Sequence, residues 1–237
     1  MLNGQKVIGI VPAAPLFEET DNRYDDKYSF SDTYCVRVTE AGMLPIGVLP
    51  VGGRIRNRIL DLCDAFIIQG GKMVRPYHID IIDYAISKEK KMLCICLGCQ
   101  TLQCYFVTKN EAERRKWHGN LADLYSVLLF KENYPFLSPV DGHNLSPILP
   151  RNNTAGTKHR VCFSAGSHTA EVFGCTELMG ASFHSFCIAD PAPELIVSGW
   201  ADDGIIEAVE YGDLIIGTQF HPDADGELPQ VFKWLAE

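Results

Sequence analysis

The feature that most constrains the fold is a regular alternation of short apolar runs with helical repeats over about the first hundred residues. The apolar runs are typical of strands buried on both faces of a sheet, and they cover 6–11, 45–50, 65–71 and 91–96. Apolar residues at three- and four-residue spacing predict helices between them, over 29–41 and around 55–62 and 79–86. This alternation predicts an α/β fold with a doubly wound parallel sheet and helices on both faces.

The second half of the chain follows a different pattern. From about 108 to 157 the alternation lapses, and we expect an irregular insertion, because the segment is first highly charged and then rich in Pro, Asn and Gly. Such a segment serves as a lid or substrate loop in some proteins and as a surface elaboration or oligomer contact in others, and both remain open. Strand-like runs and turn signals then predict a late antiparallel hairpin over 204–220, and a closing helix follows in 227–237.

The bulk composition excludes several classes of function. A net charge of −9 argues against non-specific nucleic-acid binding, which needs a basic face. No run is long and apolar enough to span a bilayer, and the first apolar run is too short for a secretory signal. The nine cysteines are an odd number without paired spacing, which argues against a secreted disulfide framework. We therefore expect a cytoplasmic protein with reduced thiols, and neither nucleic acid nor membrane as a partner.

Four cysteines gather in the stretch KMLCICLGCQTLQC, which covers 91–104. Their spacing matches neither a zinc ribbon nor a ferredoxin run, so we do not expect them to bind a metal. Core packing is the better interpretation for Cys94, Cys99 and Cys104, because a free cysteine behaves as a small buried hydrophobe. The same interpretation suits the cysteines outside this stretch: Cys35, Cys63, Cys162, Cys175 and Cys187.

Cys96 has a different setting from the other cysteines. It ends a predicted strand, lies two residues before Gly98 and leads into a predicted helix over 100–106. A strand–nucleophile–helix elbow of this kind lifts the side chain out of the sheet, and the helix N-terminus favours the reactive thiolate. The backbone N–H of Leu97 would point into the same space and stabilise an oxyanion. Cys96 is therefore the candidate nucleophile.

A candidate base lies in the stretch GTQFHPD, which covers 217–223. His221 is the one histidine of the seven that ends an apolar run and has a carboxylate two residues later. Pro222 biases His221 towards extended backbone, in which residues two apart share a face, so Asp223 is expected to reach the imidazole. A Cys–His–acid set supports thiolate attack, proton delivery to a leaving amine, and hydrolysis of the acyl-enzyme by water.

With these motifs in this order, the sequence resembles the class I glutamine amidotransferase-like superfamily, and within it the gamma-glutamyl-gamma-aminobutyrate hydrolase branch, the gamma-glutamyl cysteine peptidases. The resemblance covers most of the chain apart from 108–157. It implies one domain over 1–237, with a flavodoxin-like, mostly parallel sheet. The stretches that carry it are VIGIVPA (7–13), YCVRVTEAGMLPIGVLP (34–50), FIIQGG (66–71), ICLGCQ (95–100), DDGIIEAVE (202–210) and GTQFHPD (217–223).

Carried over by position, the resemblance assigns the roles of a catalytic triad. It implies that Cys96 is the nucleophile, His221 the base and Asp223 the acid, although the family more often has the longer Glu at this last position. It also implies that the oxyanion donors are the backbone N–H groups of Gly71 and Leu97. The expected reaction is hydrolysis of a gamma-glutamyl amide in a small-molecule substrate, which releases glutamate and an amine and calls for no metal or organic cofactor.

The resemblance also points to a substrate region, formed by Gly70, Gln100 and His184. Gln100 matches a family position just inside the elbow helix that is expected to be structural. His184 is open to two interpretations, a substrate-pocket residue or a structural histidine with satisfied hydrogen bonds.

Several departures from the family pattern lie where substrate would be chosen. They are Cys94 before the elbow, Lys72 and the non-acidic residues after the glycine pair, Ser185 and Phe186 in place of a His and a Gln, and the 108–157 segment. They bear on the substrate more than on the chemistry. Two alternatives therefore remain open, a glutaminase subunit that passes ammonia to a separate synthase and a non-catalytic ligand-binding member. A homodimer is compatible with the resemblance.

Overall fold

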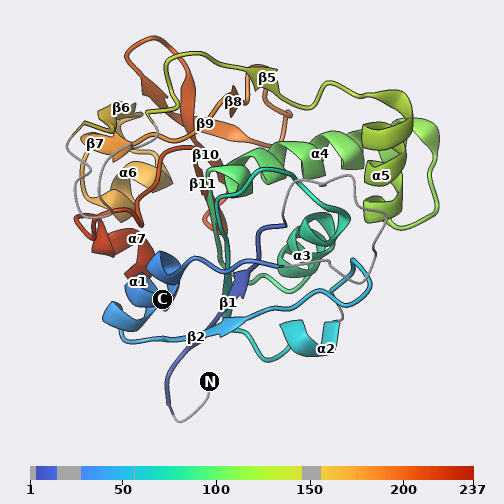
Figure 1. The fold of residues 1–237 in the computed structure, drawn as a ribbon, viewed down its shortest axis with the longest axis horizontal. Helices are drawn as coiled ribbons and strands as arrows, with labels where there is room; N and C mark the ends of the chain where they lie inside the picture. The colour runs from blue at the N-terminus through green and yellow to red at the C-terminus, as the bar shows by residue number, and fades with distance from the viewer. Residues whose placement is uncertain (1–3, 15–27, 56, 146–155) are drawn as a thin grey trace.

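The computed structural model describes residues 4–14, 28–55, 57–145 and 156–237, and it is built around a nine-stranded sheet (Figure 1). One half of the sheet is parallel and consists, in spatial order, of β2 (Leu44–Gly47), β1 (Val7–Val11), β3 (Ala65–Ile68), β4 (Met92–Ile95) and β11 (Ile215–Thr218). This is the doubly wound order of flavodoxin-like folds, in which the strand order reverses beside β1.

The other half of the sheet is antiparallel. It continues from β11 through β10 (Ile206–Tyr211), β9 (Ile196–Ala201), β6 (Lys158–Phe163) and β7 (Glu177–Ala181). Because each of these pairings reverses direction, β10 and β6 oppose the rest, and seven of the nine strands of this sheet run the same way. The predicted mostly parallel sheet and late hairpin, β10–β11, are confirmed. A small second sheet pairs β5 (Ser138–Pro139) with β8 (Phe186–Cys187).

Helices cover both faces of the sheet, as the alternation predicts (Figure 1). One core cluster joins the sheet to α2 (Asn57–Leu60), α3 (Pro76–Ser87), α4 (Leu97–Arg115) and α5 (Leu121–Glu132). The other joins it to α1 (Asp32–Glu40), α6 (His168–Phe173) and α7 (Pro229–Trp234). Successive residues of β4 alternate between the clusters, since Met92 and Cys94 belong to the first and Leu93 and Ile95 to the second.

The expectation of an irregular segment over 108–157 is wrong in its first part. Helix α4 continues to Arg115, and α5 follows at Leu121. The charged residues of this stretch suggested a loop, but they form ion pairs with one another. Arg115 contacts both Glu111 and Glu132 at 2.8 Å. Lys, Arg and Glu are good helix formers, and pairs at three- and four-residue spacing stabilise an exposed helix. Residues 146–155 of this segment lie outside the described part of the chain.

Two elements of the antiparallel half, α6 and β7, were not predicted from the sequence. Helix α6 has only six residues, too few to establish a helical repeat, and it is defined by its ends. Ser167 caps it by accepting a hydrogen bond from the Ala170 N–H, and Gly174 closes it in the left-handed conformation.

None of the helices that the structure describes combines the length and the apolar character that a transmembrane segment needs.

Candidate active site

The candidate residues come together because their strands are neighbours. Cys96 follows β4, His221 comes shortly after β11, and the glycine pair Gly70–Gly71 follows β3. These three strands are adjacent and parallel, so their carboxyl ends lie at one edge of the sheet. Ligands of doubly wound folds bind at this edge.

The backbone of Cys96 forms the predicted elbow in a strained conformation. Its φ of 53° and ψ of −104° are unusual for a residue with a side chain. A conformation of this kind costs about 1–3 kcal/mol and persists only where the surroundings enforce it. Here the Cys96 N–H donates to the Thr218 carbonyl at 2.7 Å, and the Cys96 carbonyl accepts from the Gln100 N–H at 3.1 Å. The helix after the elbow begins at once, at Leu97, three residues earlier than predicted.

The glycine after the elbow is required by the packing of the helix on the sheet. A Cβ atom at Gly98 would lie 2.4 Å from the Ile68 carbonyl oxygen of β3. No real Cβ contact is that short, and a backbone atom cannot move aside as a side chain can. A larger residue would therefore displace α4 and the cysteine at its N-terminus.

The glycine pair after β3 lies between the imidazole and the first turn of α4. A Cβ atom at Gly70 would be 2.8 Å from His221 Cε1, and one at Gly71 would be 2.8 Å from Leu97 Cδ2. The Gly70 N–H donates to the Tyr34 hydroxyl at 2.9 Å. Leu97 is the first residue of α4, where a backbone N–H has no acceptor within the helix. The structure thus places the Leu97 side chain against the backbone of Gly71, and the role of their two N–H groups as oxyanion donors stays a prediction.

His221 and Asp223 form the expected pair, although for a different geometric reason. His221 Nδ1 lies 3.1 Å from Asp223 Oδ1, so the shorter acid reaches the ring. The predicted extended backbone ends at His221, whose N–H donates to the Ala181 carbonyl at 2.8 Å. Pro222 and Asp223 lie in a turn, and this turn brings the carboxylate back to the imidazole.

Helix α1 holds the carboxylate from its other side. The Thr33 hydroxyl donates to Asp223 Oδ2 at 2.9 Å, and Arg37 Nε donates to the Asp223 carbonyl at 3.3 Å. Sequence reasoning missed these contacts and that of Tyr34, because nothing in the spacing of residues 33–37 relates them to a turn near the end of the chain. The one available signal was the helical repeat that puts Tyr34 on the buried face of α1.

The charges of the site favour a protonated imidazole beside the thiol. Burial alone would lower the pKa of His221, but the charge of Asp223, the charge of Cys96 and hydrogen bonds to both outweigh burial and raise the pKa to about 10. Burial, with Asp223 nearby, raises the pKa of the Tyr34 phenol well above its ordinary value, so Tyr34 stays neutral. Cys96 is 5% exposed and the His221 side chain 13%.

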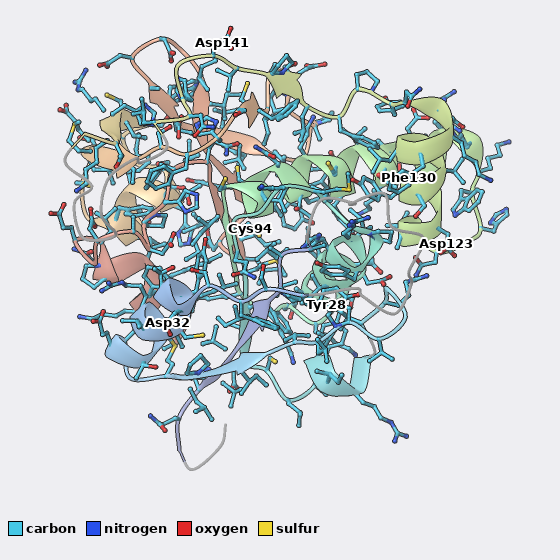
Figure 2. The ribbon with its side chains drawn as sticks, viewed as in Figure 1. Tyr28, Asp32, Cys94, Asp123, Phe130 and Asp141 are labelled. Carbon is cyan, nitrogen blue, oxygen red and sulfur yellow. The ribbon has the colours of Figure 1, made fainter. Side chains whose placement is uncertain are left out.

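The other cysteines of the stretch are core residues. Figure 2 shows Cys94 inside the fold, where β4 meets α4, and Cys94, Cys99 and Cys104 are all at most 1% exposed. Burial raises the pKa of the Cys94 and Cys99 thiols well above the ordinary value, and that of Cys104 to about 12. These thiols are therefore unreactive at neutral pH.

The residues expected near the substrate, Gln100 and His184, are engaged inside the protein. Gln100 Nε2 donates to the Phe186 carbonyl at 2.9 Å and to Gln219 Oε1 at 3.2 Å. The His184 side chain is 1% exposed, with Nδ1 3.0 Å from the Phe186 carbonyl and Nε2 3.2 Å from Glu207 Oε1. These buried contacts match the second interpretation of His184, a structural histidine with satisfied hydrogen bonds.

A family comparison covers this region of the chain. The sequence model of the family described as peptidase C26 matches residues 77–223, which is more than half of the chain and includes the elbow and the His–acid turn. The chain belongs to the peptidase C26 family. This membership confirms the class I glutamine amidotransferase-like resemblance.

Individual relatives of this C26 protein agree with the family. It is 28% identical over 216 residues to a candidate glutamine amidotransferase of Schizosaccharomyces pombe, covering 82% of this chain and 74% of that protein. The glutaminase domain of Trypanosoma brucei CTPS, solved with bound acivicin, has 15% identity and a TM-score of 0.63, with 98% of this chain and 93% of that one covered. A Thermotoga maritima glutamine amidotransferase has 15% identity and a TM-score of 0.57, with 93% and 77% covered. The two structures confirm the fold, and family and relatives together support a hydrolase of the glutamine amidotransferase type.

Proposed function

We propose that this C26 protein hydrolyses a gamma-glutamyl amide through a thioester on Cys96. The observation that carries the proposal is the strained Cys96 elbow beside a His221 imidazole that Asp223 orients. Each of the three is held by an independent backbone or side-chain contact, so the geometry does not depend on a bound substrate. A set preorganised in this way avoids the cost of assembling it during the reaction.

In the first half of the proposed reaction, the Cys96 thiolate attacks the delta-carbon of the gamma-glutamyl amide. A bond forms between Sγ and that carbon, and the carbonyl electrons move to oxygen, where the N–H groups of Gly71 and Leu97 stabilise the negative charge. Because Nδ1 of His221 is bonded to Asp223, Nε2 is the nitrogen that delivers a proton to the leaving amine. The C–N bond then breaks, the amine departs, and the thioester remains.

In the second half, water replaces the amine. Neutral His221 takes a proton from the water, whose oxygen attacks the thioester carbon. Collapse of this second tetrahedral intermediate breaks the C–S bond, restores the thiolate and the imidazolium, and releases glutamate. Asp223 keeps its charge throughout and stabilises the imidazolium.

A second candidate function uses the same chemistry with glutamine as the substrate and ammonia as the leaving group. It is favoured by the curated relatives and structural neighbours, which are named for glutamine amidotransferases or a glutaminase domain. In this case the ammonia would pass to a separate synthase, and glutaminase turnover would rise when that synthase is added.

The test is a panel of gamma-glutamyl amides that includes glutamine, with glutamate and the released amine both quantified. We expect turnover in the wild-type protein and a loss of about 10⁴-fold or more in Cys96→Ala. Cys175→Ala is the matched control, since it removes a half-buried thiol outside the elbow. Equal turnover in Cys96→Ala would exclude the mechanism, and ligand binding without turnover of any substrate would favour the non-catalytic alternative.

A further inference from the structure

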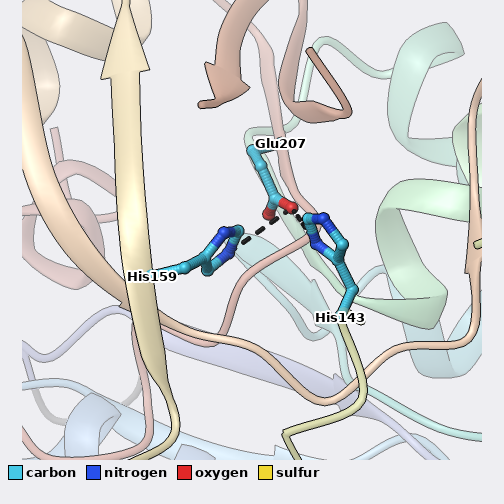
Figure 3. Close-up of side chains that lie close together, drawn as sticks. All are labelled: His143, His159 and Glu207. Carbon is cyan, nitrogen blue, oxygen red and sulfur yellow. Dashed lines mark ion pairs between the residues drawn. The ribbon is translucent and has the colours of Figure 1, made fainter. Parts of the chain in front are cut away.

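A second cluster of titratable side chains lies in the antiparallel half of the sheet. Its centre is Glu207 on β10, whose side chain is fully buried. His159 reaches it from β6, and His143 reaches it from the segment after β5, so three separate parts of the chain supply one residue each. Figure 3 shows the two imidazoles on either side of the carboxylate, with one ring nitrogen of each directed at it.

The distances within this cluster suit a metal ion. His143 Nδ1 is 3.1 Å and His159 Nε2 is 3.5 Å from Glu207 Oε1, and one ligand atom from each residue lies within 4.8 Å of the others. A tetrahedral zinc ion with ligands at about 2.0–2.1 Å has neighbouring ligand atoms about 3.3–3.4 Å apart. Each of the two ring nitrogens is thus separated from the carboxylate oxygen by about the edge of such a tetrahedron.

The outer contact of His143 fixes which of its nitrogens faces the cluster. His143 Nε2 lies 2.9 Å from Asp203 Oδ2, which accepts the Nε2–H and leaves Nδ1 turned towards Glu207. A carboxylate on the far nitrogen of a metal-binding imidazole is the usual way in which proteins orient such a ligand and raise its basicity.

Two buried atoms of the cluster lack a hydrogen-bond partner among the described residues. They are His159 Nε2 and Glu207 Oε2, and a buried carboxylate oxygen without a partner is costly. A proton on His143 Nδ1 would satisfy the pair with Glu207 Oε1 but neither of these atoms. A divalent cation bound by the carboxylate and both imidazoles would satisfy all of them.

We propose that His143 Nδ1, His159 Nε2 and Glu207 bind one divalent transition-metal ion of the zinc class. Two imidazoles and a carboxylate suit Zn²⁺, whereas Mg²⁺ and Ca²⁺ prefer oxygen ligands throughout. The fourth position belongs to water or to His184, whose Nε2 is 3.2 Å from both Glu207 Oε1 and His143 Nδ1. The ion joins the segment after β5 to strands β6 and β10.

The bound ion would also act on the region next to the elbow. His184 Nδ1 lies 3.0 Å from the Phe186 carbonyl, and the same carbonyl accepts a hydrogen bond from Gln100 in the first turn of α4. The role of the ion is therefore structural, since it would hold the β8 region in place against α4. It takes no part in the proposed thioester chemistry, so this inference can be tested independently of the proposed function.

The test is cobalt binding to the chelator-treated, purified full chain, followed by visible absorption and by equilibrium dialysis. We expect one Co²⁺ per chain, ligand-field bands of a low-coordinate N/O site without a thiolate-to-cobalt charge-transfer band, and displacement by Zn²⁺. Loss of the His159 ligand in His159→Gln should weaken binding by about 100-fold or more, and Asp203→Asn by about 10- to 100-fold. His118→Gln removes an exposed histidine and should bind as the wild type does.

Asp203→Asn keeps the test decisive if His159→Gln fails to fold, because the Asp203 side chain is 57% exposed. Weaker cobalt binding in this variant, with unchanged circular dichroism, supports the site. The proposal is overturned if the wild type binds no cobalt, if the spectrum shows thiolate ligation, or if Asp203→Asn and His118→Gln bind with the same affinity.

Discussion

The parallel and antiparallel halves of the sheet each hold a histidine against a carboxylate, but the two pairs differ in what else is close to them. In the parallel half, His221 sits between Asp223 and the Cys96 thiol at the carboxyl ends of adjacent strands. In the antiparallel half, a fully buried Glu207 meets His143 together with two further imidazoles, those of His159 and His184. In the proposed function the first arrangement moves a proton, and in the proposed metal site the second holds chain segments together. What each histidine–carboxylate pair can do therefore depends on the side chains beside it more than on the pair itself.

The largest expected effect concerns the acid of the parallel half. Asp223→Asn should reduce kcat by about 10⁴-fold, because an amide neither stabilises the imidazolium nor enforces the correct tautomer. Thermal stability should change little by comparison. Steady-state kinetics with the best substrate of the panel, together with a melting curve, measures both. A normal kcat in Asp223→Asn would show that the carboxylate of the parallel half has no catalytic role, and the two halves would then not differ in function.

The corresponding change in the antiparallel half should lower the stability of the protein and leave its kcat unchanged. Glu207→Gln, measured on chelator-treated protein, should lower the free energy of unfolding by about 3–5 kcal/mol, because it breaks a buried ion pair. The folded fraction should keep its kcat. Denaturant unfolding and active-site titration separate the two quantities, and a specific loss of kcat with normal stability would show that the cluster takes part in the chemistry.

The pH dependence should follow the imidazole of the parallel half. The pKa of His221 is raised from its ordinary value to about 10, so the protonated ring and the stability it contributes are fully present below the ordinary value and are lost as the pH rises through about 10. kcat/KM should fall in the same range, since the leaving amine then lacks its proton donor. In Asp223→Asn the alkaline limb should move to lower pH, and a limb at the same position in both proteins would contradict this assignment.

The smallest expected effect concerns the support from helix α1. Thr33→Val removes the hydrogen bond to Asp223 Oδ2 and should lower kcat about tenfold, which is typical of one hydrogen bond to a charged group. Thr39→Val is the matched control, because its hydroxyl donates to the Cys35 carbonyl within the same helix. Thr33 acts through Asp223, so its loss should also shift the alkaline limb, whereas the control should leave the pH profile unchanged.

The two halves also differ in how far the sequence could predict them. The parallel strands β1, β3, β4 and β11 are buried on both faces and therefore read as continuous apolar runs. The close packing of Gly98 on Ile68 requires a glycine after the elbow, and this glycine is visible in the sequence. Because neighbouring parallel strands end at one edge, strand order alone brings Cys96 and His221 together. The elbow and the His–acid pair were thus accessible from local pattern.

The rest depends on contacts that no local pattern records. Thr33 reaches Asp223 across most of the chain length, and the turn that folds Asp223 back to His221 replaces the extended backbone that Pro222 suggested. His143, His159 and Glu207 come from three segments without a shared spacing, in a region of short strands. The charged segment that became α4 and α5 was misjudged because its ion pairs form only once the helices do.

The central claim, a thioester on Cys96, is tested most directly by intact mass. The His221→Ala variant is exposed to a gamma-glutamyl thioester, whose thiolate leaving group departs without a proton from the imidazole, and the protein is then digested to locate any adduct. We predict one gamma-glutamyl group per chain on the peptide that contains Cys96, and none in Cys96→Ala. A gamma-glutamyl adduct on another cysteine, or gamma-glutamyl amide turnover by the wild type that persists in Cys96→Ala, would contradict the account.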